Sequence, residues 1–100
     1  MSIGALFEVD GFTSADYEAV SAQLGEEPIK GLLVHIAGPT ESGWRVIEVW
    51  DTEEDQRRLQ EDRLNPAFDA AKKQRVSPTF FPVHTILPPP EALSSLAPGS

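Results

Sequence analysis

The chain has 100 residues and a formal net charge of -8 at pH 7, because 16 acidic side chains outnumber 8 basic ones, and it contains no cysteine. This length predicts one domain, and the excess of carboxylates argues against nucleic acid or an anionic membrane surface as a partner. Without cysteine there is neither a disulfide framework nor a thiolate nucleophile. The start of the chain has no basic leader, and no apolar run approaches the roughly 20 residues that span a bilayer, so we expect a cytoplasmic protein.

The first two predicted elements are a strand and a helix. The stretch IGALFEV, residues 3–9, is short, apolar and compatible with a β-strand, and it ends at the turn signal DG. Apolar residues then recur at helical spacing over residues 17–24. Thr13 is the expected N-cap, with Asp16 three residues later, and Gly25 is the expected end of this helix.

A hairpin and a second helical region follow. The stretch GLLVHIAGPTESGWRVIEVW, residues 31–50, predicts two strands joined by the turn GPTESG. Thr52 is the expected N-cap of a helix in which acidic residues precede arginines, as the helix dipole favours. We expect Asn65 and Pro66 to interrupt this helix, with Asn65 capping a new one that runs to residue 74.

The end of the chain predicts one more strand and a tail. TFFPVHTIL, residues 79–87, is the fourth predicted strand, and Pro82 within it favours an edge position. From residue 88 the composition shifts to PPPEALSSLAPGS. We therefore expect a folded domain over residues 1–87 and a Pro-rich, extended or disordered tail over residues 88–100.

The element order βαββαβ is that of the ferredoxin-like α+β fold. This fold has one four-stranded antiparallel sheet in the order 4-1-3-2 with both helices on one face. The opposite face would expose too much apolar surface to be left in water. We therefore expect a homodimer in which the sheets of two copies pack against each other.

Alternation of side chains sorts the hairpin into two faces. Pairing apolar with apolar positions avoids burying lone polar groups and selects one register. That register places Val34, Ile36, Ile47 and Val49 on an apolar face, and His35, Trp44, Glu48 and Trp50 on the opposite, chemically mixed face.

The mixed face is expected to continue onto the outer strands. Glu8 and His84 would then form a row across the sheet with Glu48 and His35. Two imidazoles and two carboxylates suit zinc or iron by ligand type, but their spacing matches no recognised metal motif, so no metal site is predicted.

His35 is the first candidate for a catalytic residue. Imidazole exchanges protons near neutral pH, which suits general acid–base chemistry on a phenol, an enol or a peroxide. Glu48 is the second catalytic candidate, because a carboxylate can orient the imidazole. The alternative for His35 is a buried histidine with a purely structural hydrogen bond.

Four further residues form the expected substrate-binding set. Trp44 and Trp50 offer flat apolar surface and an N–H donor for an aromatic molecule. Tyr17, the only tyrosine, lies on the inward face of the first helix, and His84 lies on the fourth strand. For each of the four, core packing, an interface or surface exposure is the structural alternative.

The segments GLLVHIAG, GWRVIEVW and RLNPAF together resemble the dimeric α/β-barrel superfamily, particularly the small proteins related to antibiotic-biosynthesis monooxygenases. The resemblance covers residues 3–87. It implies a ferredoxin-like protomer with a pocket between sheet and helices, in a dimer whose two sheets form a barrel. The haem-degrading branch relies on an asparagine in the first strand, whereas the only asparagine here is Asn65.

The resemblance implies a cofactor-independent monooxygenase that acts on an aromatic or polyketide-like substrate. A polyketide-cyclase-like enzyme would use a similar pocket and stays open as an alternative. A non-catalytic module for ligand binding or dimerisation is the alternative from another class. A cavity that reaches His35 would favour an enzyme, and closed packing around it would favour the non-catalytic module.

Overall fold

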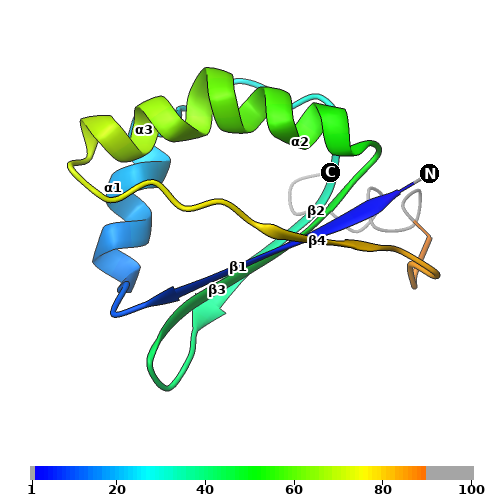
Figure 1. Cartoon of the computed structure of the whole chain (residues 1–100), viewed down its shortest axis with the longest axis horizontal. Helices are drawn as coiled ribbons and strands as arrows, with labels where there is room; N and C mark the ends of the chain where they lie inside the picture. The colour runs from blue at the N-terminus through cyan, green and yellow to red at the C-terminus, as the bar shows by residue number, and fades with distance from the viewer. Residues whose placement is uncertain (1, 90–100) are drawn as a thin grey trace.

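The structure is a computed structural model and describes residues 2–89. The predicted tail lies outside the described residues apart from Pro88 and Pro89, which are exposed. A four-stranded antiparallel sheet carries the helices on one face (Figure 1). This is the ferredoxin-like α+β arrangement that the element order predicted. In the described part of the chain, no helix is long and apolar enough to cross a bilayer.

The sheet has the predicted strand order. Its neighbours run β2-β3-β1-β4, so the hairpin strand β2 and the last strand β4 form the two edges. The last strand ends at Pro82 instead of continuing to residue 87, because Pro82 pairs with Ile3, the first residue of its only neighbouring strand. The bounds are Ile3–Asp10 for β1, Leu32–Pro39 for β2, Gly43–Trp50 for β3 and Thr79–Pro82 for β4.

The helix α1 (Ser14–Leu24) begins and ends where the sequence predicts. The Thr13 hydroxyl accepts from the backbone N–H of Asp16 at 3.2 Å, and the Asp16 carboxylate accepts from that of Thr13 at 3.0 Å. This reciprocal capping box satisfies two N–H groups that the first helical turn leaves free. Gly25 ends the helix with a φ of 85°, a conformation that glycine adopts without strain.

The predicted break at Asn65 and Pro66 is absent from the second helical region. It runs without interruption through α2 (Glu53–Leu59), a π-helical turn η1 (Gln60–Leu64) and α3 (Asn65–Ala70). Thr52 caps α2 as predicted, but Asn65 is helical and its N–H bonds to the carbonyl of Gln60. The wider π turn moves the preceding carbonyl away from the Pro66 ring, so the proline is accommodated without ending the helix.

The same region is shorter at its end than predicted. The helix α3 ends at Ala70 instead of residue 74. Two residues later Lys72 has a φ of 59°, which lies in the left-handed region and is incompatible with a continuing right-handed helix.

The predicted register of the hairpin is confirmed. His35 lies opposite Glu48, and Ile36 lies opposite Ile47. The helices cover the mixed face, and the apolar face points away from them. Strands β2 and β3 therefore bring His35 and Glu48 beneath the helices.

The predicted faces of β1 are reversed in the structure. Ala5 pairs with Glu48 and therefore shares the mixed face, whereas Glu8 pairs with Arg45 on the opposite face. Arg45 donates to the Glu8 carboxylate at 3.0 Å, with both side chains about half exposed. An acidic side chain with a cationic partner available on the open face does not need to be buried under the helices.

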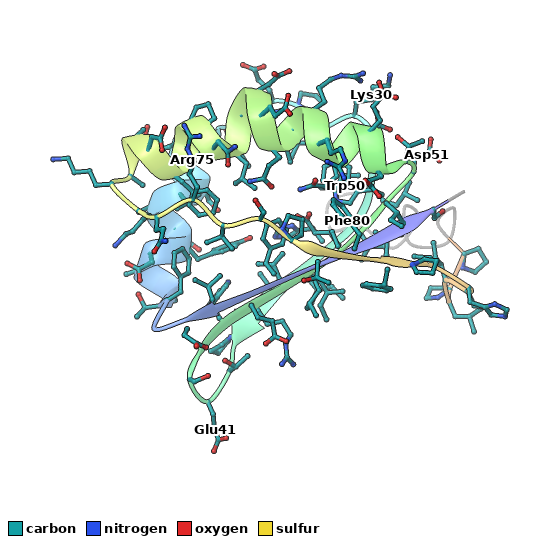
Figure 2. All side chains as sticks on the ribbon, viewed as in Figure 1. Lys30, Glu41, Trp50, Asp51, Arg75 and Phe80 are labelled. Atoms are coloured by element: carbon teal, nitrogen blue, oxygen red, sulfur yellow. The ribbon has the colours of Figure 1, made fainter. Side chains whose placement is uncertain are left out.

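Two groups of buried side chains form the core, one between the sheet and α2 and one between α1 and α3. Trp50 is fully buried against Ala5 and Leu59, at the α2 end of the molecule. The second group joins α1 to α3 through Val20, Ala67 and Phe68. Figure 2 shows Trp50 and Phe80 between the sheet and α2, while Glu41 projects from the tip of the hairpin. The cavity described next lies within the same layer.

Candidate active site

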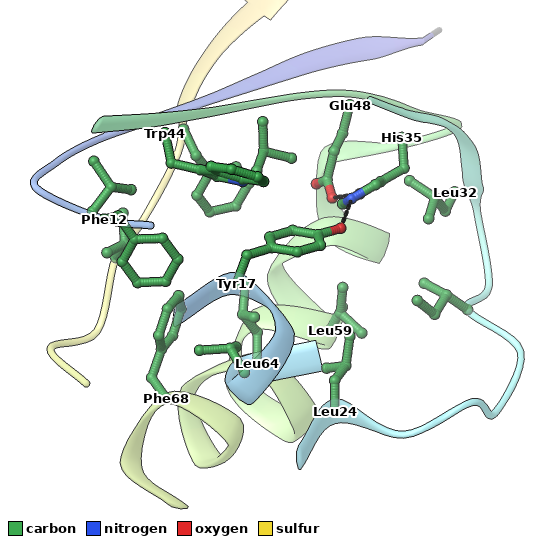
Figure 3. Close-up of a pocket in the computed structure, with 16 residues that line it drawn as sticks. Phe12, Tyr17, Leu24, Leu32, His35, Trp44, Glu48, Leu59, Leu64 and Phe68 are labelled. Atoms are coloured by element: carbon green, nitrogen blue, oxygen red, sulfur yellow. Dashed lines mark hydrogen bonds and ion pairs between the residues drawn. The ribbon is translucent and has the colours of Figure 1, made fainter. Parts of the chain in front are cut away.

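A cavity of about 230 Å³ lies between the mixed face of the sheet and the helices (Figure 3). Sixteen residues line it, and only three of them carry titratable groups: Tyr17, His35 and Glu48. The remaining wall is aliphatic and aromatic, and includes Phe7, Phe12, Leu24, Leu64 and Phe68. The cavity therefore has an apolar body with a single polar end.

The three titratable side chains form one chain of hydrogen bonds, anchored by a fourth residue. His35 Nδ1 lies 2.7 Å from Glu48 Oε2, and His35 Nε2 lies 2.7 Å from the Tyr17 hydroxyl, as the dashed lines in Figure 3 mark. The indole of Trp50 donates from Nε1 to the other Glu48 oxygen, Oε1, at 2.9 Å. Both Glu48 oxygens and both His35 nitrogens are thus engaged.

The donors and acceptors in this chain can be assigned from chemistry. A carboxylate only accepts, so the Glu48 carboxylate calls for a proton on His35 Nδ1. In neutral imidazole the other nitrogen, Nε2, is then an acceptor, and it accepts from the Tyr17 hydroxyl. The arrangement follows the logic of the Ser-His-Asp triad, with a phenol in the place of the serine hydroxyl.

Regular secondary structure positions each member of the chain. His35 and Glu48 are cross-strand partners in β2 and β3. Trp50 follows Glu48 by two residues, so its side chain lies on the same face of β3. Tyr17 comes from the first full turn of α1, and Figure 3 shows its ring directed from that helix toward His35.

The chain of hydrogen bonds leads from the interior toward the surface. The Glu48 side chain is 8% exposed and that of His35 is 35% exposed. Burial raises the pKa of the Tyr17 hydroxyl above its ordinary value of 10.0, and the negative charges of Glu18 and Glu48 act in the same direction. Tyr17 therefore remains protonated at neutral pH and can donate to His35.

The two predicted tryptophans differ in their surroundings. Trp44 lines the cavity, with its ring centroid 5.2 Å from that of Tyr17 at a tilt of 33°. Its Nε1 is buried without a hydrogen-bond partner. Trp50 does not line the cavity, which corrects its predicted place in the substrate-binding set. Its ring is buried in the core against Ala5 and Leu59, and its N–H donates a hydrogen bond to Glu48.

His84 is also outside the cavity, and the predicted row across the sheet is wrong. It lies beyond the end of β4 and is exposed. Glu8 is on the opposite face of the sheet from Glu48, so neither residue joins the pair formed by Glu48 and His35. Among the residues that the structure describes, no group of three or more potential ligands is placed to hold a metal ion.

Arg63 was not singled out from the sequence, although it supports the wall of the cavity. Its guanidinium donates to the backbone carbonyls of Leu24 at 3.1 Å, Glu27 at 3.2 Å and Pro28 at 3.2 Å. These bonds satisfy carbonyls at the end of α1 and hold the segment leading to β2, from which Ile29 reaches the cavity.

Comparison with known proteins establishes the fold. No family model matches the chain, and no curated protein matches it. Its structure resembles one from Chloroflexus aurantiacus J-10-fl that carries the provisional description of an antibiotic biosynthesis monooxygenase. The match covers 86% of this chain and 97% of that chain, with a TM-score of 0.56 and 18% sequence identity. The predicted ferredoxin-like fold is confirmed, and at this identity the likeness carries no further than the fold.

The raised pKa of Tyr17 can be measured directly, because no other tyrosine is present. In an ultraviolet titration we expect an ionisation midpoint above 10.0 for the native protein and near it for the denatured chain. The native state then holds this proton more tightly than the unfolded state. The free energy of unfolding should therefore keep this contribution below pH about 10 and lose it as the pH rises through the native pKa. A native midpoint at or below the denatured one would contradict this assignment.

Proposed function

We propose that the chain is a cofactor-independent, monooxygenase-like enzyme that acts on a small aromatic or polyketide-like molecule. The observation that best supports this is the chain from Glu48 through His35 to Tyr17 at the polar end of an otherwise apolar cavity. Such a site would hold an aromatic ring by apolar contact and present its hydroxyl or enol group to a base.

The volume of the cavity favours a substrate of one or two fused rings. An engineered apolar cavity of about 150 Å³ binds benzene. The present cavity, at about 230 Å³, is larger by an amount that suits a second fused ring. Trp44 and Phe12 would supply flat walls for such a ring system.

Proton transfer would pass through Tyr17. Its hydroxyl donates to His35 Nε2, and its oxygen keeps a lone pair that can accept a hydrogen bond from the substrate hydroxyl. As the Tyr17 proton moves to His35, the substrate proton would move to Tyr17. Glu48 would then stabilise the imidazolium, as the carboxylate of a catalytic triad does. The substrate is left as a phenolate or enolate, the electron-rich form that reacts with oxygen.

The reaction balances without an external reductant when the substrate carries a CH₂ group that is activated by the ring, as in the keto form of 1-naphthol. One atom of O₂ replaces the two hydrogens on that carbon and forms a ketone. The other oxygen atom leaves with those hydrogens as water, and the carbon supplies all four electrons. The protein then needs only to bind, desolvate and deprotonate the substrate.

Oxygen uptake with a panel of 1-naphthols tests this proposal. We expect His35→Ala to lower kcat by roughly 10²- to 10⁴-fold, the usual contribution of a general base. The matched control is His84→Ala, because His84 is the only other histidine and lies outside the cavity. Equal turnover by both variants would remove His35 from the mechanism, and no turnover by the wild type on any compound would remove the monooxygenase assignment.

A non-catalytic ligand-binding module is the second candidate. The observation in its favour is that Tyr17 already occupies His35 Nε2, so no free nitrogen of His35 faces a ligand directly. A polyketide-cyclase-like enzyme would use the same base and the same cavity. Ligand binding without turnover would support the module, whereas ring closure of a poly-β-ketone without oxygen uptake would support the cyclase.

We also propose that the protein is a homodimer joined through the apolar face of the sheet. On this face Ile36 is 60% exposed, Ile47 is 37% exposed and Phe81 is 43% exposed. Apolar side chains grouped in this way on an open sheet are typical of an interaction surface. A second copy of the chain is the proposed occupant, since two such faces can bury one another by packing sheet on sheet.

Light scattering after size-exclusion chromatography tests the dimer. We expect twice the chain mass at micromolar concentration for the wild type. Ile36→Glu should give a monomer, because it would place a charged carboxylate within the apolar interface. The control Ala19→Glu changes an exposed position on α1, away from the sheet, and should remain dimeric. A monomeric wild type would contradict the dimer.

A further inference from the structure

We propose that Gln60 is a positioning residue that limits the substrate of the proposed enzyme to two fused rings. It holds the loop between α3 and β4 (residues 71–78, the α3–β4 loop) so that Val76 closes the apolar end of the cavity. The inference deepens the proposed function, on which its meaning for substrate choice rests. It can be measured by ligand binding alone, without turnover.

The two ends of the cavity lie at different elements. Figure 3 shows His35 and Leu32 at one end, and Phe12 and Phe68 at the other. Val76 lines the cavity and packs against the buried group that contains Phe68, so it belongs to the apolar end. A planar ligand whose hydroxyl lies at the polar end therefore directs its far ring toward Val76.

Polar contacts attach the α3–β4 loop to the helices. The loop forms neither helix nor strand, and Val76 is its only residue that lines the cavity. Lys73 pairs with Asp16 at 2.6 Å, and Arg75 pairs with Asp69 at 2.6 Å. These ion pairs tie the loop to α1 and α3, but neither involves Val76 itself.

Gln60 holds Val76 directly, through a buried amide whose orientation is fixed. Its Nε2 donates to the backbone carbonyl of Val76 at 2.9 Å and to Asn65 Oδ1 at 2.8 Å, and its Oε1 accepts from Gln56 Nε2 at 3.0 Å. A backbone carbonyl only accepts, so the nitrogen of Gln60 has to face Val76. The Gln60 side chain is buried, so water competes little for this bond.

The π turn explains how Gln60 reaches its partners. Gln60 opens η1, and its carbonyl accepts from the N–H of Asn65 five residues later. The side chains of the same two residues are joined as well, which ties the amide to this wide turn. Such turns within α-helices are frequent at functional sites. Here the turn also carries Leu64, another residue of the cavity wall, so Gln60 connects the helix wall with the α3–β4 loop.

The test compares the affinity for a two-ring phenol, 2-naphthol, with that for the longer three-ring phenol 2-anthrol, each followed by the change in ligand fluorescence. An open apolar site would bind 2-anthrol more tightly, because the longer ligand buries more apolar surface. We expect the wild type to bind it at least about tenfold more weakly, since its third ring would have to displace Val76.

The substitution Gln60→Met keeps the length of the side chain but removes the donor to Val76. The preference for 2-naphthol should then shrink by at least about tenfold, because the α3–β4 loop can move aside for the third ring. The ion pairs of Lys73 and Arg75 remain and keep the loop attached.

Gln56→Met is the matched control, because it removes a buried amide from the same helical region and leaves Gln60 bonded to Val76. It should keep the wild-type preference. Val76→Ala shortens the wall itself and should admit 2-anthrol. This variant changes only a partly buried loop side chain, so it gives an answer even where Gln60→Met does not fold.

Three results would overturn the inference. The first is a wild type that does not bind 2-naphthol more tightly than 2-anthrol. The second is a wild-type preference that persists in Val76→Ala or in folded Gln60→Met. The third is a Gln56→Met variant that loses the preference to the same extent as Gln60→Met.

These outcomes are separate from those of the proposed function. Oxygen uptake with 1-naphthols and an unchanged preference in the variants would retain the proposed function and remove the role of Gln60. The expected preferences without oxygen uptake would retain the role of Gln60 in ligand selection and remove the monooxygenase assignment.

Discussion

The burial of Glu48 is the constraint on which the site depends. Its side chain lies beneath the helices, in a cavity whose other walls are almost entirely apolar. A carboxylate left there without partners would cost several kcal/mol. His35 and Trp50 each donate to a different oxygen of Glu48, and these two bonds allow the charge to be buried. The bond from His35 to Glu48 also orients the imidazole toward Tyr17. The same interactions that stabilise the buried charge therefore form an ordered chain of hydrogen-bond donors and acceptors.

The sheet supplies both donors with ordinary strand geometry. His35 is the direct cross-strand neighbour of Glu48, and Trp50 follows on the same face of the same strand. Tyr17 comes instead from α1, a helix fixed by its capping box at one end and by Arg63 at the other. The sheet thus carries Glu48, Trp50 and His35, and a separately anchored helix carries Tyr17 at the other end of the chain of hydrogen bonds.

Local rules predicted the features that depend on strand alternation and helix capping, including the register of His35 against Glu48. The face of Glu8 did not follow from alternation, because both sets of β1 side chains contain apolar residues and the choice depends on its distant partner Arg45. The contact of Tyr17 with His35 was also missed. It depends on how α1 lies over the sheet, and residue spacing within either element carries no information about that packing.

The most direct test of the site is a crystal structure with a two-ring phenol such as 2-naphthol bound. We expect the rings to lie in the cavity beside Trp44 and Phe68, with the ligand oxygen at hydrogen-bond distance from the Tyr17 hydroxyl. A ligand that binds only outside the cavity, or one whose hydroxyl points away from Tyr17 and His35, would contradict the assignment of this cavity as the substrate site.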